Sequence, residues 1–266
     1  MAEPHASMPS LNAARWTGFS TIIIREYSRI VRIWGQTLVP SAVTAILYFV
    51  IFGSLIGRRV GQMGGFDYMQ YIAPGLIMMS VITNSYGNTV SSFFGAKFGK
   101  HIEELLVSPL PNWIIVAGYA AGGVLRGVMV GAVVTVVSLI FARLPVQHLG
   151  LTVAAVLMTS LVFSLGGFIN AVFGKNFDQI NWIPAFVLTP LTYFGGVFYS
   201  VSMLPPWARA LSHFNPILHM VNAFRFGFLG VSDVSVVGAF AIMVTLAVVM
   251  FLVALNLMNR GVGIRD

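Results

Sequence analysis

Long apolar segments are the feature that most restricts how this chain can fold. A helix needs about 20 mostly apolar residues to cross the hydrocarbon core of a bilayer. Single strands of that length could not satisfy their backbone polar groups in lipid, whereas a helix satisfies them internally. Six windows qualify, at approximately 36–57, 68–94, 113–142, 149–173, 180–201 and 234–258. The sequence therefore predicts an all-α integral membrane protein with six transmembrane helices.

Composition agrees with a chain that is surrounded by lipid. Charged residues make up 9% of the 266 residues and hydrophobic residues 57%, whereas soluble domains carry about 25% charged residues. So few charges could not cover a soluble globule of this size. Five of the six windows contain no Asp, Glu, Lys or Arg, and the third contains Arg126 alone. The chain has no cysteine, which excludes disulfides and thiolate metal sites.

The distribution of Lys and Arg predicts the orientation, because cytoplasmic loops carry an excess of these residues. With the N-terminus inside, the inner segments hold nine of them and the outer segments hold five. The inner ones are Arg15, Arg25, Arg29, Arg32, Lys97, Lys100, Lys175, Arg260 and Arg265, and the outer ones are Arg58, Arg59, Arg143, Arg209 and Arg225. Both termini are therefore expected in the cytoplasm. The net charge of +7 is explained by these loops, and no nucleic-acid partner is expected.

Residues 1–35 are expected to form a cytoplasmic N-terminal part that contains an amphipathic helix over 14–34. On a helical wheel the charged residues share an arc of about 120°, and the large apolar residues fall on another face. The charged set is Arg15, Arg25, Glu26, Arg29 and Arg32, and the apolar set is Trp16, Phe19, Ile23, Tyr27, Ile30 and Trp34. This pattern is typical of an interfacial helix on the inner leaflet. Its role is either to anchor the chain to anionic membrane lipids or to dock a protein.

The transmembrane domain is expected to cover 36–258, followed by a cytoplasmic tail at 259–266. Within it, residues 202–233 are fairly apolar but interrupted by proline and glycine. Two short helices fit, one opened by Pro205 and Pro206 and the other by Pro216. Neither reaches spanning length. We therefore expect a re-entrant helical hairpin on the outer face, before the last span.

The segment at about 97–108, between the second and third spans, carries an unusual concentration of charge. Glu103 and Glu104 are two of only eight acidic residues in the chain. Ile102, Leu105 and Leu106 share one face of a short predicted helix, and Pro109 and Pro111 stop it before the third span. The segment is either a solvated connector or a peg that fits a cleft on a cytoplasmic partner.

Arg126 lies near the middle of the third span, where a charge costs about 2.5–3.5 kcal/mol or more. It should face the bundle interior or a wet cavity. Its role is either structural, bonded to carbonyl or Asn groups, or contact with an anionic part of a substrate. Gly123, Gly127 and Gly131 beside it have the spacing that lets helices approach closely, which favours packing. Asn84, Asn88 and Asn170 are further polar groups within the spans.

Motifs that carry enzymatic chemistry are absent from the sequence. It has no HExxH or GxSxG, and no GxxxxGK[ST] loop to cradle ATP phosphates. No catalytic residue, metal site or bound cofactor is therefore assigned to this chain. His213 and His219 are widely spaced and lack neighbouring ligands, which favours ordinary polar contacts over a metal site. None of the acidic residues lies within a span, which argues against ion-coupled transport.

Several strings resemble a known family over nearly the whole chain. They are Arg29-Ile30-Val31-Arg32-Ile33-Trp34, Ala73-Pro74-Gly75-Leu76-Ile77-Met78-Met79, Ser92-Phe93-Phe94-Gly95-Ala96-Lys97-Phe98, Ile102-Glu103-Glu104-Leu105-Leu106, Leu188-Thr189-Pro190-Leu191-Thr192-Tyr193, Leu204-Pro205, Asn215-Pro216-Ile217, His219 and Arg225. In these residues the chain is similar to the ABC-2-type permeases, the membrane subunits of bacterial ABC exporters.

The resemblance implies partners and a location that the residues alone do not. It implies a homodimer in the bacterial cytoplasmic (inner) membrane, working with two copies of a separate ATPase that bind ATP and Mg²⁺. It also implies that the segment at about 97–108 is the coupling helix that contacts this ATPase. The residues expected to serve there are Lys97, Lys100, Ile102, Glu103, Glu104, Leu105 and Leu106.

The resemblance implies ATP-driven export of an amphipathic or polymeric substrate, such as a polysaccharide, a lipid or a drug. The residues that are candidates for the path are Tyr48, Asn84, Asn88, Arg126, Thr189 and Tyr193. The alternative is a membrane-embedded lipid or sugar transferase. That enzyme would need a carboxylate or histidine cluster at the membrane surface, and the sequence shows none. A structural scaffold without transport is a third option.

Overall fold

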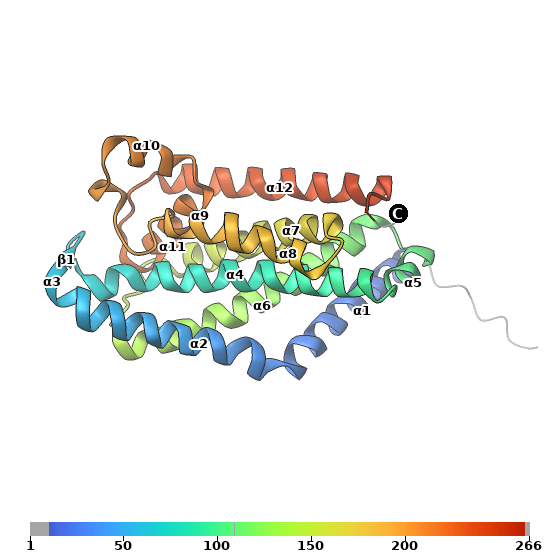
Figure 1. Cartoon of the computed structure of the whole chain (residues 1–266), viewed down its shortest axis with the longest axis horizontal. Helices are drawn as coiled ribbons and strands as arrows, with labels where there is room; N and C mark the ends of the chain where they lie inside the picture. The colour runs from blue at the N-terminus through green and yellow to red at the C-terminus, as the bar shows by residue number, and fades with distance from the viewer. Residues whose placement is uncertain (1–10, 109, 264–266) are drawn as a thin grey trace, which may run out of the picture.

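A computed structural model describes residues 11–108 and 110–263. Pro109 and Arg265, which the sequence predictions used, lie outside the described residues. The chain forms an elongated bundle of helices that run mostly along its long axis (Figure 1). The start of the first helix, the short helix α5 and the C-terminal end of the last helix lie at one end of the bundle, as the predicted topology requires. We call this the α5 end.

Four helices are long and apolar enough to cross a membrane, by length and composition, among the residues that the structure describes. They are α2 (Trp34–Ile51), α6 (Asn112–Phe141), α7 (Leu149–Phe173) and α12 (Val236–Arg260). They correspond to the first, third, fourth and last predicted spans. α4 (Tyr68–Phe98) covers the second and is longer than any of them, but its many polar residues keep it below the hydropathy of the four. Six crossings therefore remain a prediction.

The fifth predicted span, at 180–201, is misplaced. The helical stretch begins earlier, with α8 (Phe177–Ile183), continues through the π-helical turn η2 (Pro184–Leu188) and ends with α9 (Thr189–Tyr193). Proline has no backbone N–H to give to the helix, which explains the irregular turn at Pro184. Gly196, with φ +69°, lies in the tight turns that follow. The apolar sequence continues beyond Tyr193, where α9 ends, so a prediction from hydropathy alone places the C-terminal end of the helix too late.

The predicted amphipathic helix is α1 (Leu11–Arg32), and one of its faces packs into the bundle. Ile22, Glu26 and Ile30 lie one turn apart and are at most 5% exposed, because this face packs against α6. The prediction that groups Glu26 with the arginines on the charged face of an interfacial helix is therefore wrong. Trp16 and Tyr27 are exposed, as expected for an interfacial aromatic face. Ile33, with φ −110° and ψ 25°, separates α1 from α2.

A small β-hairpin was missed by the all-α prediction. After α2, the turn η1 (Phe52–Gly57) and α3 (Arg58–Val60) lead into β1 (Gln62–Met63), which pairs antiparallel with β2 (Phe66–Asp67). Gly64 and Gly65 between the strands have φ of +59° and +83°. Two consecutive positive φ values are what a two-residue type I′ turn requires.

The two short helices before the last span start where the prolines predict. They are α10 (Pro206–His213), preceded by the 3₁₀ turn η3 (Val201–Met203), and α11 (Pro216–Leu229). Proline suits the first helical position because the N–H that it lacks would be unpaired there. The Asn215 side chain accepts a hydrogen bond from the Ile217 N–H and caps α11. Most of α11 is buried against α4, α7 and α12, and its re-entry into the bilayer remains a prediction.

The glycines near Arg126 bring three helices together. A Cβ on Gly123 would collide with Thr89 of α4 and Ser164 of α7, and one on Gly127 would collide with Ser85 and Ser160 of the same two helices. Small residues at this spacing allow close helix contact. These contacts agree with a packing role for the glycine stripe.

Candidate coupling site and transport path

The short helix α5 (Ile102–Val107) stands at the α5 end, between the end of α4 and the start of α6. Ile102 is buried and Leu105 half-buried, and these side chains hold the helix on the bundle. Glu103 and Glu104 are exposed, and so are Leu106 and Val107. Leu106 was predicted to share the inward face with Ile102 and Leu105, but it is 38% exposed. α5 therefore presents two carboxylates and two aliphatic side chains to the outside.

Lys97 points inward rather than toward a partner. It lies in the last turn of α4, and its Nζ donates to the carbonyl oxygens of Val172 and Gly174, each at 2.8 Å. These carbonyls belong to the end of α7, where unpaired carbonyls and the helix dipole favour a cation. Lys97 thus ties the base of α5 to the end of α7. Lys100, in the turn before α5, is exposed.

We expect Lys97→Met to lower the free energy of unfolding by about 1–2 kcal/mol, because two carbonyls at the end of α7 lose a charged donor. Lys100→Met is the matched control. Its side chain is exposed, so we expect a change of less than about 0.5 kcal/mol. Thermal unfolding of the purified variants in detergent measures both. Equal melting temperatures for the two variants would show that the Lys97 bonds contribute nothing.

Glu26 lies at the centre of a polar network that joins α1 to α4. Arg29 donates to its Oε2 at 2.9 Å, Asn88 Nδ2 donates to the same oxygen at 3.2 Å, and the Ser92 hydroxyl donates to Oε1. Arg29 also donates to the Asn88 side chain at 2.7 Å and to its backbone carbonyl at 3.2 Å. Glu26 is 1% exposed and Arg29 28%. The carboxylate is thus paired and fully hydrogen-bonded, which burial of a charge requires.

A second glycine pair makes room for this network. A Cβ on Gly118 would lie 2.7 Å from Ile22 Cγ2, and one on Gly122 would lie 2.6 Å from Glu26 Cγ. The four-residue spacing of the two glycines matches that of Ile22 and Glu26, so α1 seats directly on α6. Sequence reasoning missed the burial of Glu26. The matching spacings were the signal that could have found it.

Arg126 lies within the bundle, as predicted, and bonds to Asn84. Its Nη2 donates to Asn84 Oδ1 at 3.3 Å, and Asn84 Nδ2 donates to the Ser41 hydroxyl at 3.1 Å. This chain of contacts links α6, α4 and α2. Asn84 and Ser41 also line a cavity of about 180 Å³ between α2 and α4, together with Thr44, Tyr48, Ser80 and Thr83 among others. The structure thus brings together three of the predicted path residues, Tyr48, Asn84 and Arg126, along this side of the bundle.

Tyr48 and Tyr193 meet in an aromatic cluster. Their hydroxyls are 3.5 Å apart, and the Tyr193 ring stacks on Phe198 at a centroid distance of 5.7 Å. Phe52 stacks on Phe198 at 4.8 Å. Two of the predicted path residues, from distant parts of the chain, thus adjoin each other. Tyr193 is 44% exposed, so the cluster opens onto the surface that α2 and α9 share.

The other two predicted path residues have local partners. Thr189 is exposed and donates to the Pro184 carbonyl in the irregular turn of its own helix. Asn88 is fully buried in the Glu26 network. The six residues therefore do not form one continuous lining. Five of them belong to the α2–α4 cavity and its neighbour Arg126, the aromatic cluster or the α1–α4 network, and Thr189 belongs to none of these.

Arg225 was counted among the charges of the outer segments, but it is a buried residue of α11 and not an exposed loop charge. It is fully buried, lies 4.1 Å from the centroid of the Tyr71 ring, and donates to the carbonyl oxygens of Tyr71 and Gly196 at 3.3 and 2.7 Å. Tyr71 in turn donates to Asp233 at 3.2 Å. This set fixes α11 to α4 at the end opposite α5. A buried guanidinium carries no weight in a count of loop charges.

The structure is an apolar helical bundle with four helices long and apolar enough to cross a membrane among its described residues, which is the architecture of a helical integral membrane protein. Residues 17–229 match the ABC-2 type transporter family. The chain is 53% identical over 251 residues to the inner membrane transport permease YadH of Escherichia coli K12, covering 94% of this chain and 98% of that relative. It is 24% identical over 216 residues to nodulation protein J of Rhizobium leguminosarum bv. viciae, covering 81% and 83%.

This chain therefore belongs to the ABC-2 type transporter family. It is a transport permease subunit of the bacterial inner membrane, and its family pairs such subunits with an ABC ATPase. This membership favours the permease over the lipid or sugar transferase that the sequence left open.

Proposed function

We propose that two copies of this chain form the membrane part of an ATP-driven exporter. Two ATPase subunits on the cytoplasmic side bind ATP and Mg²⁺, and this chain holds no cofactor of its own. The cargo is an amphipathic or polymeric molecule, such as a polysaccharide, a lipid or a drug. The observation that carries the proposal is the family match over residues 17–229, which includes α5 with its exposed carboxylates.

In this proposal α5 receives the motion of the ATPases. Its two exposed carboxylates and its exposed aliphatic residues suit a cleft with basic and apolar groups on the partner. A push on α5 reaches α4 and α6 directly, since it connects them. Lys97 passes the displacement to α7, and the Glu26 network passes it to α1. These contacts supply a continuous mechanical route from the coupling helix to four helices of the bundle.

The cargo then leaves along the surface that α2 and α9 share, near the subunit interface. The α2–α4 cavity supplies hydroxyl and amide groups, and the cluster of Tyr48, Tyr193, Phe52 and Phe198 supplies aromatic surface. Such mixed polar and aromatic linings suit amphipathic molecules. Arg126, bonded to Asn84 of the cavity lining, adds a positive charge that favours an anionic group on the cargo.

Co-purification with the neighbouring ATPase tests the function. We expect the two proteins to form a complex that hydrolyses ATP and is stimulated by cargo, while this chain alone shows no hydrolysis. Clear ATP turnover by the pure chain, or a fully active complex with only one copy of it, would refute the proposal.

The topology of the proposal is tested with reporter fusions. We expect fusions at the N-terminus, near residue 100 and at the C-terminus to report the cytoplasm, and a fusion near residue 62 to report the outside. The reason is the excess of Lys and Arg on the inner segments, which grows when the buried Arg225 is left out of the outer set. An external signal at residue 100 would overturn this orientation.

We expect Arg126→Ala to reduce cargo-stimulated ATP hydrolysis at least about tenfold while the complex with the ATPase stays intact. Arg126 lies in the middle of α6, far from α5, and the substitution removes its charge from beside Asn84 of α4. A tenfold change corresponds to about 1.4 kcal/mol, which is modest for a polar group buried in a bundle. Val136→Ala, on the exposed side of α6, is the control. Loss of ATPase binding by Arg126→Ala would contradict its assignment to the path.

A further inference from the structure

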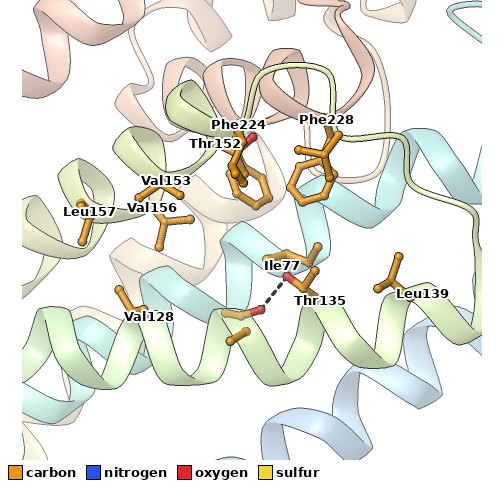
Figure 2. Close-up of a pocket in the computed structure, with 14 residues that line it drawn as sticks. Ile77, Val128, Thr135, Leu139, Thr152, Val153, Val156, Leu157, Phe224 and Phe228 are labelled. Atoms are coloured by element: carbon orange, nitrogen blue, oxygen red, sulfur yellow. Dashed lines mark hydrogen bonds between the residues drawn. The ribbon is translucent and has the colours of Figure 1, made fainter.

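A second cavity lies away from the proposed path, between α6 and α7. It encloses about 430 Å³, and Figure 2 shows its walls formed by the two helices. Ile77 of α4 and Phe224 and Phe228 of α11 form its floor. We call it the α6–α7 crevice. Nothing in the coupling route or the proposed path uses it.

The lining of the crevice is almost entirely hydrocarbon. Its two hydroxyls are turned back onto their own helices: Thr135 donates to the Gly131 carbonyl at 2.7 Å and Thr152 to the His148 carbonyl at 3.0 Å. Neither is left in need of a partner. A polar ligand would lose its bonds to water here without replacing them, so the crevice suits an apolar occupant.

The mouth of the crevice opens where lipid is expected. Both walls are helices that are long and apolar enough to cross a membrane. The rim residues Leu139, Leu149 and Val153 are each about half exposed or more, at 54%, 67% and 49%. The crevice is therefore continuous with the apolar outer surface of the bundle, and acyl chains can reach it from the side.

The segment 142–148 contributes Val146 to the lining of the crevice and carries a cation, Arg143. The segment is held in place, since the N–H groups of Gln147 and His148 donate to the carbonyls of Phe228 and Gly227, and Gln70 donates to the Arg143 carbonyl at 2.9 Å. Arg143 is exposed and lies just past the end of α6. A guanidinium just beyond the end of a membrane-spanning helix is near the expected depth of the lipid headgroups, where it can bind a phosphate.

The size of the crevice decides between possible occupants. A transmembrane helix has a diameter of about 10–12 Å and a length of about 30 Å, and so occupies roughly 2,400–3,400 Å³. That is several times the 430 Å³ available. One flexible acyl chain is thin enough to enter a slot that a helix cannot. A whole helix of a second copy therefore does not fit inside the crevice.

We propose that the α6–α7 crevice binds one acyl chain of a membrane phospholipid, whose phosphate lies against Arg143. The lipid completes the packing between α6, α7 and α11, which side chains leave open on this face. The site is independent of the direction of transport and of the nature of the cargo.

Native mass spectrometry of the full chain tests this proposal. The protein is stripped of lipid in detergent and titrated with phosphatidylglycerol. We expect one phospholipid per chain to bind more tightly than the remainder. Ala132→Trp fills the crevice from α6, and Val153→Trp fills it from α7; each should lower the tightly bound fraction at least about fivefold. Val136→Trp adds the same ring to α6 one turn away, outside the lining, and should bind as the wild type does.

The variants also separate the two parts of the lipid. Arg143→Gln should weaken binding by a smaller factor, since it removes the phosphate contact and leaves the acyl site. The proposal is refuted if both filling variants keep the wild-type melting temperature and the wild-type bound lipid. It is also refuted if they convert a dimer to a monomer without changing lipid binding, since a second chain would then be the occupant.

Discussion

Replacing both Glu103 and Glu104 with Ala should abolish productive coupling while leaving the membrane protein folded. Both carboxylates are exposed on α5, and surface substitutions usually change stability by less than about 0.5 kcal/mol. Close charge pairs across an interface have coupling energies of about 1.5 kcal/mol or more, and 1.4 kcal/mol is tenfold in affinity. We therefore expect association with the ATPase to weaken at least about tenfold and cargo-stimulated hydrolysis to be lost. Binding assays and ATPase assays on purified components measure both.

A control that also removes an exposed carboxylate lies at the other end of the bundle. Asp67 is exposed at the start of α4, and Asp67→Ala removes one carboxylate without touching α5. We expect it to bind the ATPase as the wild type does. Unchanged melting temperatures establish that any loss in the α5 variant is not a folding defect. If that variant binds and couples normally, α5 is a plain connector and the proposed contact lies elsewhere.

The helices that could be predicted from the sequence are those whose first and last residues are determined by neighbouring residues in the chain. α10 and α11 begin at Pro206 and Pro216 because proline suits the first helical turn, whatever the helix later packs against. α6 and α7 begin and end within a residue of the predicted windows, because their apolar runs stop at polar or proline-containing segments. These limits depend on a few neighbouring residues, so sequence reasoning reaches them.

The parts that could not be predicted depend on distant residues or on backbone geometry. A helical wheel of α1 groups Glu26 with the arginines, since it contains no information about α6 or α4. The burial of Glu26 is set by Gly122, Asn88 and Ser92, which follow far later in the chain. The partners of Arg225, Tyr71 and Gly196, are also distant from it in the sequence. A hydropathy window likewise cannot register the irregular turn that Pro184 introduces.

The candidate path shows the same division. Residue type was enough to select Asn84 and Arg126, because polar groups in an apolar span must find partners, and the two are bonded to each other. Nothing in the residue type of Asn88 distinguished it from Asn84, although it belongs to the α1–α4 network. Asn84 and Asn88 are only four residues apart on α4, yet Asn84 lines the cavity and Asn88 is buried against α1.

Glu26→Ala should be the most destabilising single substitution on α1. It removes the acceptor of three hydrogen bonds and leaves Arg29 without its carboxylate. Breaking a buried ion pair by removing one partner costs about 3–5 kcal/mol. Arg29 is 28% exposed and keeps its bonds to Asn88, so water and these acceptors offset part of the loss. We expect the free energy of unfolding to fall by about 2–3 kcal/mol, measured by thermal unfolding in detergent.

Four further variants decide whether the network, and not the side-chain volume, produces this effect. Glu26→Gln keeps the shape and most of the hydrogen bonds, so it should cost less than Glu26→Ala. Glu103→Ala removes an exposed carboxylate and should change stability by less than about 0.5 kcal/mol. Arg29→Ala combined with Glu26→Ala should cost less than the sum of the single changes, because the two residues share one network. Additive costs would mean that Glu26 and Arg29 act independently, and Glu26 would then hold α1 on α4 through Asn88 and Ser92 and not through the ion pair.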